Sequence, residues 1–222
     1  MGYTHYWHRP QTVPDGTWCS IRRDFGELIL PLSDEGVELA GGLGEGPPEI
    51  TSEEIWFNGP KACGHPVNED LVIPYPSEAA HGIGPSATAI GRDFYGFGVT
   101  VAHRCCNGSC CYETFSLPKS IKLRPYDEPD EHGLYINFVK TAFRPYDIAV
   151  TAALLIVKRY LGHQLVVASN GGDAQWLDAR RICQKVLGYG EWFGIVEEKT
   201  IEESPEREVT SRILIEAQPP EL

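Results

Sequence analysis

The fold is decided by a continuous run of alternating segments: residues 134–139 (LYINFV), 146–161 (YDIAVTAALLIVKRYL), 165–169 (LVVAS) and 173–187 (DAQWLDARRICQKVL). The first and third segments are short and apolar, as buried strands are. The second is apolar nearly all round, which predicts a helix buried on most of its sides. The fourth is amphipathic and is followed by Gly188, a residue typical of the position after a helix. This order predicts a right-handed crossover between two parallel strands, followed by a second helix.

The residues before this run add a strand and a helix. Residues 2–8 alternate, so that His5 lies between two aromatic side chains on one face of a strand. Pro14 is suited to the first turn of a helix, and we expect Pro31 to close that helix. The pattern predicts an α+β fold, with a single mixed sheet and about three helices mainly on one face. Further short strands are expected at 37–40 and 54–58.

A long segment rich in glycine and proline, residues 59–111, interrupts the pattern. We interpret it as an insertion, either with short strands of its own or as a cover over a functional site. Near its end, residues 99–104 and 112–117 flank Asn107-Gly108, the dipeptide most typical of a type I′ β-hairpin. The sequence therefore predicts an insertion that ends in a cysteine-bearing hairpin.

Composition excludes several classes of protein. The 222 residues are 42% hydrophobic, which suffices for a core, yet no run approaches the roughly 20 apolar residues of a membrane-spanning helix. A net charge of −12 argues against a protein that coats duplex nucleic acid. We expect residues 1–196 to form one domain and residues 197–222 an acidic tail, with an edge strand near 209–215. The N-terminus lacks the pattern of a secretory signal, which predicts a cytoplasmic protein.

Two loops follow the two predicted parallel strands, and each leads into the start of a helix. The carboxyl ends of parallel strands meet at one edge of a sheet, and helix N-termini favour anions. If the first strand were parallel as well, its end would reach the same edge. These loops can equally be ordinary helix caps and tight turns with solvated cations. The candidate residues for binding a small anionic ligand are His8, Arg9, Lys140, Thr141, Arg144, Asp147, Ser169, Asn170 and Gly171.

The cysteines suggest a metal site, because four of the seven lie between residues 105 and 111. In the predicted hairpin Cys105 lies opposite Cys110, and Cys63-Gly64-His65 could complete a Cys₃His tetrahedron around a structural zinc. The spacing is not that of a zinc knuckle, so inert thiols or a reactive thiol are alternatives. The candidate metal ligands are Cys63, His65, Cys105 and Cys110.

Several short motifs together resemble a family of small proteins from bacteriophages and prophages. The motifs occur in the family's order and begin with residues 2–7 (GYTHYW). The resemblance implies a viral context, an accessory role that acts on host physiology or host defence, and the host-cell cytoplasm; it implies no mechanism. The remaining motifs are FNG at 57–59, ETF at 113–115, KTA at 140–142 and PYD at 145–147.

Three functions are compatible with these patterns. The first is the binding of a small anionic, nucleotide-like ligand, by which a phage protein could sequester a host defence signal. The second is a protein–protein interaction module, as a host-protein inhibitor or virion accessory protein, with the acidic surface and tail as the contact. The third is a small hydrolase or phosphoesterase that uses His8, Asp147 or a metal at the cysteines. No catalytic motif is present, which favours binding; the oligomeric state, including a homo-oligomer, stays open.

Overall fold

The computed structural model describes residues 3–65, 70–71, 94–96, 99–101, 104–106, 108–201 and 208–216. The helices are α1 (Asp15–Asp34), α2 (Asp147–Leu161), α3 (Asp173–Leu187) and the short 3-10 helix η1 (Gly162–Gln164). The strands are β1 (Thr4–Arg9), β2 (Glu49–Ile50), β3 (Glu54–Phe57), β4 (Asp70–Leu71), β5 (Phe94–Gly96), β6 (Val99–Val101), β7 (Arg104–Cys105), β8 (Phe115–Pro118), β9 (Tyr135–Lys140), β10 (Val166–Ser169), β11 (Phe193–Ile201) and β12 (Glu208–Glu216).

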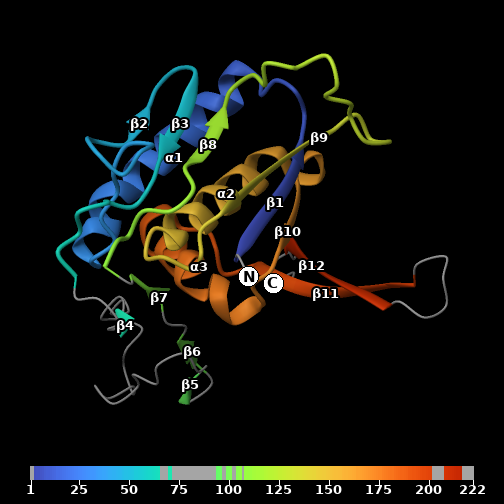
Figure 1. Cartoon of the computed structure of the whole chain (residues 1–222). Coiled ribbons are helices and arrows are strands. Elements are labelled where there is room, and N and C mark those ends of the chain that lie inside the picture. Colours follow the sequence, from blue (N-terminus) through green and yellow to red (C-terminus); the bar gives the residue numbers. More distant parts are fainter. Residues whose placement is uncertain are drawn as a thin grey trace.

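The main sheet has five strands in the order β11-β12-β10-β1-β9 (Figure 1). Strand β1 is antiparallel to both of its neighbours, β9 and β10. These two strands therefore run in the same direction, as predicted, but β1 lies between them and every ladder of the sheet is antiparallel. The α+β class is confirmed; the mixed sheet expected from the crossover is instead an antiparallel one.

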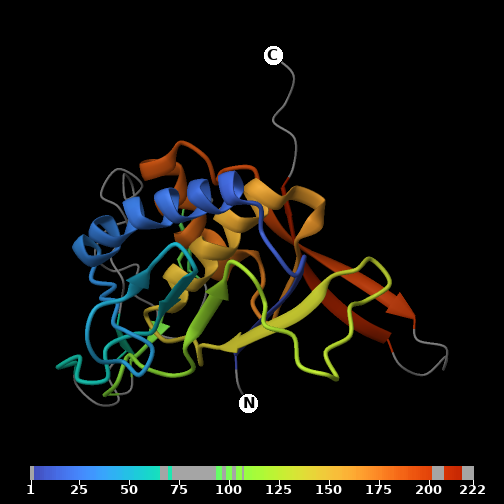
Figure 2. The same cartoon turned by 90° about the horizontal axis from the view of Figure 1, so that it is seen from above.

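The three α-helices pack on one side of this sheet (Figure 2). Helix α2 is buried on all sides from Asp147 to Val157, as its apolar sequence predicts. Helix α3 ends at Gly188, whose φ of 77° is left-handed. Helix α1 differs from the prediction, because Pro31 lies inside it and does not end it. The carbonyl that Pro31 leaves without its helical bond belongs to Glu27, an exposed residue, while Leu32 beyond it is fully buried.

A second sheet of three strands, β2-β3-β8, packs beside α1. A chain of aromatic rings joins it to the main sheet: Trp7 lies 5.5 Å from Phe115, Phe115 4.9 Å from Phe57, and Phe57 5.1 Å from Phe25 of α1.

The strand pairing shows that the predicted hairpin is wrong. Strand β8 pairs with β3, whereas β7 pairs with β4. The strand expected at 37–40 is reduced to one bridge, between Ala40 and Asn58.

Two further expectations concern the insertion and the C-terminal segment. The insertion does carry short strands, β4 to β7, although much of it lies outside the described residues. The expected acidic tail, residues 197–222, is not a tail through residue 216: β11 extends to Ile201, and β12 lies between β10 and β11 inside the sheet. The acidic composition of this segment suggested an exposed tail, but cross-strand ion pairs offset part of its charge. Glu197 of β11, for example, lies opposite Arg212 of β12 and pairs with it at 3.0 Å. Among the described residues, none of the helices combines the length and apolarity that crossing a bilayer requires.

Candidate ligand pocket and metal centre

A buried polar network joins the two predicted loops at the edge where β9 and β10 end. At its centre is His5, which is fully buried near the start of β1. Its Nε2 lies 2.7 Å from Oδ1 of Asp147, the first residue of α2, and its Nδ1 lies 3.0 Å from Oγ of Ser169 at the end of β10. Thr141 donates its hydroxyl to the same Asp147 oxygen at 2.6 Å. The prediction that the two loops share an edge is therefore confirmed, with His5 as their link.

The charge of the network is set by Asp147. Burial alone would raise the pKa of this carboxyl, but interactions with His5, Arg104 and Thr141 outweigh burial and hold the pKa below its usual range. Arg104 contributes a guanidinium whose Nη2 lies 3.5 Å from Oδ2 of Asp147. The carboxylate is therefore ionised and internally compensated, which makes it a structural anchor at the start of α2.

Ser169, His5 and Asp147 form a serine–histidine–aspartate array that the sequence did not reveal. The serine oxygen, however, is saturated by its neighbours. It accepts hydrogen bonds from the Gly171 N–H at 2.9 Å and from Trp176 Nε1–H at 3.3 Å, and its own proton can be donated to Nδ1 of His5. No lone pair is left for attack on a substrate, so we interpret the array as a brace between β1, β10 and α2.

An open pocket of about 630 Å³ lies beside this brace, at the N-terminus of α3. Two aromatic rings, Tyr3 and Phe143, lie 4.8 Å apart and form part of its wall. We call this cavity the α3 pocket. Its full lining consists of Tyr3, Phe143, Asn170, Gly171, Gly172, Asp173, Ala174, Gln175 and Arg212.

The acidic and basic side chains of the α3 pocket are held by neighbours. Asp173 accepts the Ile195 N–H at 3.0 Å and pairs with Arg180 at 2.7 Å, which offsets its charge. Arg212 donates to the Asn170 carbonyl at 2.7 Å, which keeps its guanidinium at the pocket wall, and it also pairs with Glu197 at 3.0 Å. The guanidinium and the start of α3 are the two features of the pocket that suit a negatively charged group.

Phe143 is held in the wall by an unusual backbone. Ala142 and Phe143 both have positive φ, 50° and 54°, which non-glycine residues rarely adopt. The Phe143 ring contacts both Tyr3 and the guanidinium of Arg104, whose central carbon is 4.7 Å from the ring centroid. These two contacts support a strained turn at the pocket.

The predicted ligand residues divide into three groups. Asn170 and Gly171 line the α3 pocket, and Ser169, Thr141 and Asp147 belong to the brace beneath it. Lys140 and Arg144 are near this edge but outside the pocket lining.

His8 and Arg9 lie at the opposite end of the sheet, which corrects the prediction. Because β1 is antiparallel to β9 and β10, its first residues, and not its last, reach the edge where those strands end. His8 binds Asp130 at 2.9 Å, and Arg9 donates to the carbonyl of Pro118 at 2.5 Å. His8 and Asp147 therefore lie at opposite ends of β1 and do not share one site. Lys140 forms an ion pair away from the pocket, since its ammonium lies 3.7 Å from the Glu113 carboxylate.

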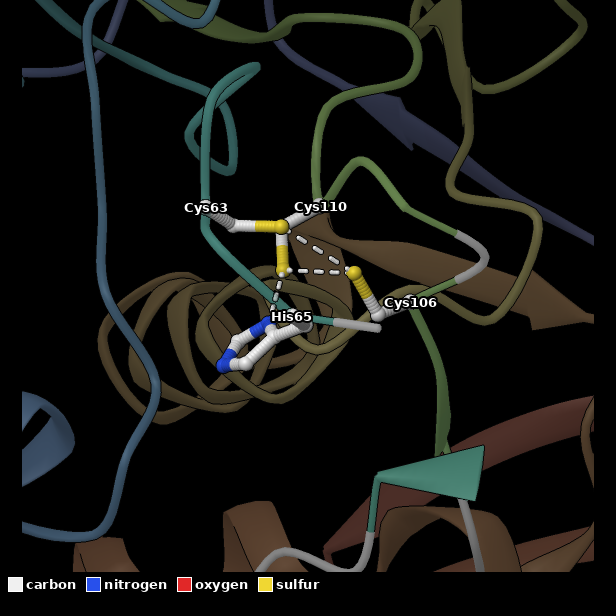
Figure 3. Close-up of side chains that lie close together, drawn as sticks. All are labelled: Cys63, His65, Cys106 and Cys110. Carbon is white, nitrogen blue, oxygen red and sulfur yellow. Dashed lines mark hydrogen bonds between the residues drawn. The ribbon is translucent and has the colours of Figure 1, made fainter. Parts of the chain in front are cut away.

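The candidate metal ligands form a separate cluster of Cys63, His65, Cys106 and Cys110 (Figure 3). The Cys106 sulfur lies 3.2 Å from that of Cys63 and 3.5 Å from that of Cys110, which in turn lies 3.4 Å from Nδ1 of His65. All four ligand atoms lie within 4.8 Å of one another. Sulfurs around a tetrahedral zinc are about 3.8 Å apart, so this cluster needs to expand only slightly to hold the ion.

The four ligands are a chemical match for zinc. Hydrogen bonds from the His65 backbone and from Cys106 and Cys110 outweigh burial and lower the pKa of Cys63 to about 6, whereas burial raises that of Cys106 and of Cys110. The cluster thus favours one thiolate, and a divalent cation would stabilise the other two. Three sulfurs and one imidazole form the Cys₃His set of structural zinc sites.

Among the described residues Cys106 supplies the third sulfur. The sequence had favoured Cys105, whose side chain lies outside the described ones. The Ser109 N–H donates to the Cys106 carbonyl at 3.2 Å. Cys110 is held near Cys63 by the bond from its N–H to the carbonyl of Pro60 at 3.1 Å.

Sequence reasoning missed Arg104, Tyr3 and Arg212. Arg104 lies in the insertion, where the pattern gives no structural register, and Arg212 lies in the segment expected to be a tail. Tyr3 could have been found from the alternation of residues 2–8, which places it on the face of His5.

Comparison with known proteins adds no assignment: no family model, no curated protein and no solved structure matches the chain.

Proposed function

We propose that the protein binds a small anionic, nucleotide-like ligand in the α3 pocket. The observation that carries the proposal is the convergence of a fixed guanidinium, a glycine pair at a helix N-terminus and two aromatic rings on one cavity. Its volume, about 630 Å³, is within the ~300–1,000 Å³ range of small-molecule sites. The cation and the start of α3 suit a phosphate, and the wall of Tyr3 and Phe143 suits a flat ring.

The resemblance to bacteriophage proteins supplies the context for this proposal. A protein that binds a nucleotide-like signal without turning it over would lower its free concentration in the host. Saturation of the Ser169 oxygen supports binding over hydrolysis at this edge. We therefore propose sequestration of a host defence signal as the biological role.

Calorimetry with inorganic phosphate, pyrophosphate and mononucleotides tests the binding. Arg212→Gln should weaken binding by about 1.5–3 kcal/mol, the free energy of a charge-assisted hydrogen bond. Lys140→Gln is the matched control, because it removes the same charge from a residue outside the pocket. Equal affinities of the two variants, or no binding by the wild type, would contradict the proposal.

We also propose that Cys63, His65, Cys106 and Cys110 hold a structural zinc ion. The ion would join two segments that are distant in sequence, residues 63–65 and 106–110. Elemental analysis of the purified protein should find one zinc per chain, and Cys106→Ser should lose it. Cys111→Ser is the control, since this adjacent cysteine is outside the cluster.

A second candidate function, a protein-interaction module, is favoured by the uncovered face of the main sheet. Ile136 and Phe138 on β9 are 59% and 57% exposed, and Phe138 lies 6.2 Å from the ring of Tyr6 on β1. Exposed apolar groups of this kind often mark contacts with other proteins. A host protein retained by the wild type and lost with Phe138→Ser would support this function; equal recovery by both would contradict it.

A further inference from the structure

Arg104 connects the metal centre to the floor of the α3 pocket. Its side chain is fully buried, and the guanidinium contacts three elements. Nη1 pairs with Asp178 of α3, while Nη2 donates to the Gln175 carbonyl of α3 at 2.9 Å and lies 3.5 Å from Asp147 at the start of α2. The guanidinium also stacks over Phe143 of the pocket wall.

The backbone of Arg104 is linked just as directly to the metal cluster. Cys106, two residues later, places its sulfur 3.2 Å from Cys63 and 3.5 Å from Cys110. Cys110 lies in a closely packed part of the chain: its N–H bonds the Pro60 carbonyl, and a Cβ added to Gly59 would lie 2.2 Å from the Cys110 carbonyl oxygen. The short segment 104–106 is thus fixed at one end by the cluster and at the other by two buried carboxylates.

The placement of Arg104 also decides the state of those carboxylates. Asp147 is fully buried and Asp178 nearly so, and Arg104 is the cation that both contact. Moving it away would remove a buried cation from both carboxylates, while Asp147 would keep its contacts with His5 and Thr141. The Arg104 guanidinium must therefore stay between Asp147 and Asp178 for α2, α3 and Phe143 to keep their arrangement.

We propose that zinc binding at the cluster and ligand binding in the α3 pocket are energetically coupled, with Arg104 as the positioning residue between them. The metal fixes Cys106, Cys106 fixes Arg104, and Arg104 supports Phe143 and the first turns of α2 and α3. This inference rests on the function proposed for the α3 pocket. Because coupling is reciprocal, a ligand in the pocket should strengthen zinc binding by the same factor.

The experiment compares zinc-loaded and chelator-treated protein with two readouts. The first needs no ligand: the NMR signal of the Trp176 indole Nε1–H, which bonds Ser169 at 3.3 Å and reports the state of the brace. The second is the affinity for inorganic phosphate or a mononucleotide. In the wild type, removing zinc should shift or broaden the Trp176 signal and weaken phosphate binding about 5- to 150-fold, as coupled sites do.

Three variants locate the coupling. Arg104→Lys keeps the charge but cannot reach all its partners, so it should still bind zinc while the effect of zinc on both readouts disappears. Cys63→Ser leaves Arg104 intact and should reproduce the zinc-free state of the pocket. Arg9→Lys is the matched control, a buried arginine at the opposite end of the sheet that should keep the full effect.

The outcomes separate this inference from the proposed function. The coupling would be overturned if the Trp176 signal and the phosphate affinity were the same in zinc-loaded and chelator-treated protein. Failure of the protein to bind zinc would overturn it as well. A full effect of zinc in Arg104→Lys would overturn the role of Arg104. If the Trp176 signal follows zinc but neither phosphate nor nucleotide binds, the coupling between the two regions stands and the proposed function fails.

Discussion

The hydroxyl oxygen of Ser169 lies 3.0 Å from Nδ1 of His5, and this contact joins the last residue of β10 to the start of β1. The same oxygen accepts the Gly171 N–H and the indole N–H of Trp176. One hydroxyl therefore fixes the histidine, the loop that lines the α3 pocket and a buried ring of α3. The hydrogen bonds of this hydroxyl hold together the two polar loops that meet at the end of β9 and β10.

Ser169→Ala should lower the free energy of unfolding by about 1–3 kcal/mol, because it leaves buried donors and an acceptor without partners. Urea denaturation gives this value, and the Trp176 indole signal should shift in parallel. Ser116→Ala, at an exposed position of β8, is the control and should change stability by less than about 0.5 kcal/mol. A Ser169→Ala protein as stable as the control would show that the brace has no structural role.

Asp147 should contribute stability that depends on pH with a definite sign. Its pKa in the folded protein is lowered, so the contribution is complete above the unfolded value near 3.8 and is lost as the pH falls through the lower folded value. Asp147→Asn should therefore be destabilised relative to wild type at pH 6, and the difference should shrink toward pH 3. Unfolding free energies over this range test it, with Asp34→Asn, an exposed residue, as the control. A difference that grows as the pH falls would have the wrong sign.

A third buried carboxylate, Asp24 of α1, should be equally important to the helical layer. It accepts the hydroxyls of Tyr160 at 2.6 Å and Tyr189 at 2.7 Å and so connects α1 to α2 and to the chain after α3. Asp24→Asn should cost about 1–3 kcal/mol, and each Tyr→Phe change at 160 or 189 about 0.5–1.5 kcal/mol. A double-mutant cycle between Asp24 and Tyr160 measures their interaction; additive effects would contradict a direct bond.

Gly171 and Gly172 provide a matched pair for testing the geometry of the α3 pocket. A Cβ on Gly171 would lie 1.9 Å from the hydroxyl oxygen of Tyr3, whereas one on Gly172 would meet nothing closer than 3.5 Å. Gly171→Ala should thus displace Tyr3, cost about 1–3 kcal/mol in stability and weaken ligand binding. Gly172→Ala should be within about 0.5 kcal/mol of wild type. Thermal unfolding and calorimetry of the two variants decide the matter, and equal behaviour would contradict this arrangement.

The helices could be predicted from sequence because their signals are local. The interval 173–187 coincides with α3, and 146–161 differs from α2 by one residue, since apolar periodicity and the glycines at 162 and 188 mark their ends. Helix α1 was misjudged only at Pro31, where burial of Leu28 and Leu32 outweighs one missing hydrogen bond. Such tertiary packing is not visible in the spacing of residues along one helix.

Strand pairing could not be predicted in the same way, because it depends on residues distant in sequence. The direction of β1 relative to β9 and β10 decides whether His5 or His8 reaches the candidate site, and nothing in residues 2–8 specifies that direction. The strand expected near 209–215 is likewise present as β12, but its place between β10 and β11, and not at an edge, depends on partners elsewhere in the chain. The convergence of two loops was predictable, whereas the third element that links them was not.

The cluster of described residues contains Cys106, whereas the sequence favoured Cys105, and experiment can distinguish the two assignments. Cys106 completes a four-ligand set with Cys63, His65 and Cys110, so zinc has no need of a fifth ligand from Cys105. Cys106→Ser should lose the ion and the stability that it provides, whereas Cys105→Ser should retain both. Because an ion that binds only the folded state adds about 2.7 kcal/mol when present at 100 times its dissociation constant, chelator should lower the unfolding midpoint of wild type and Cys105→Ser but leave that of Cys106→Ser unchanged. The reverse pattern would restore Cys105 as the ligand and would remove the link from the cluster through Cys106 to Arg104.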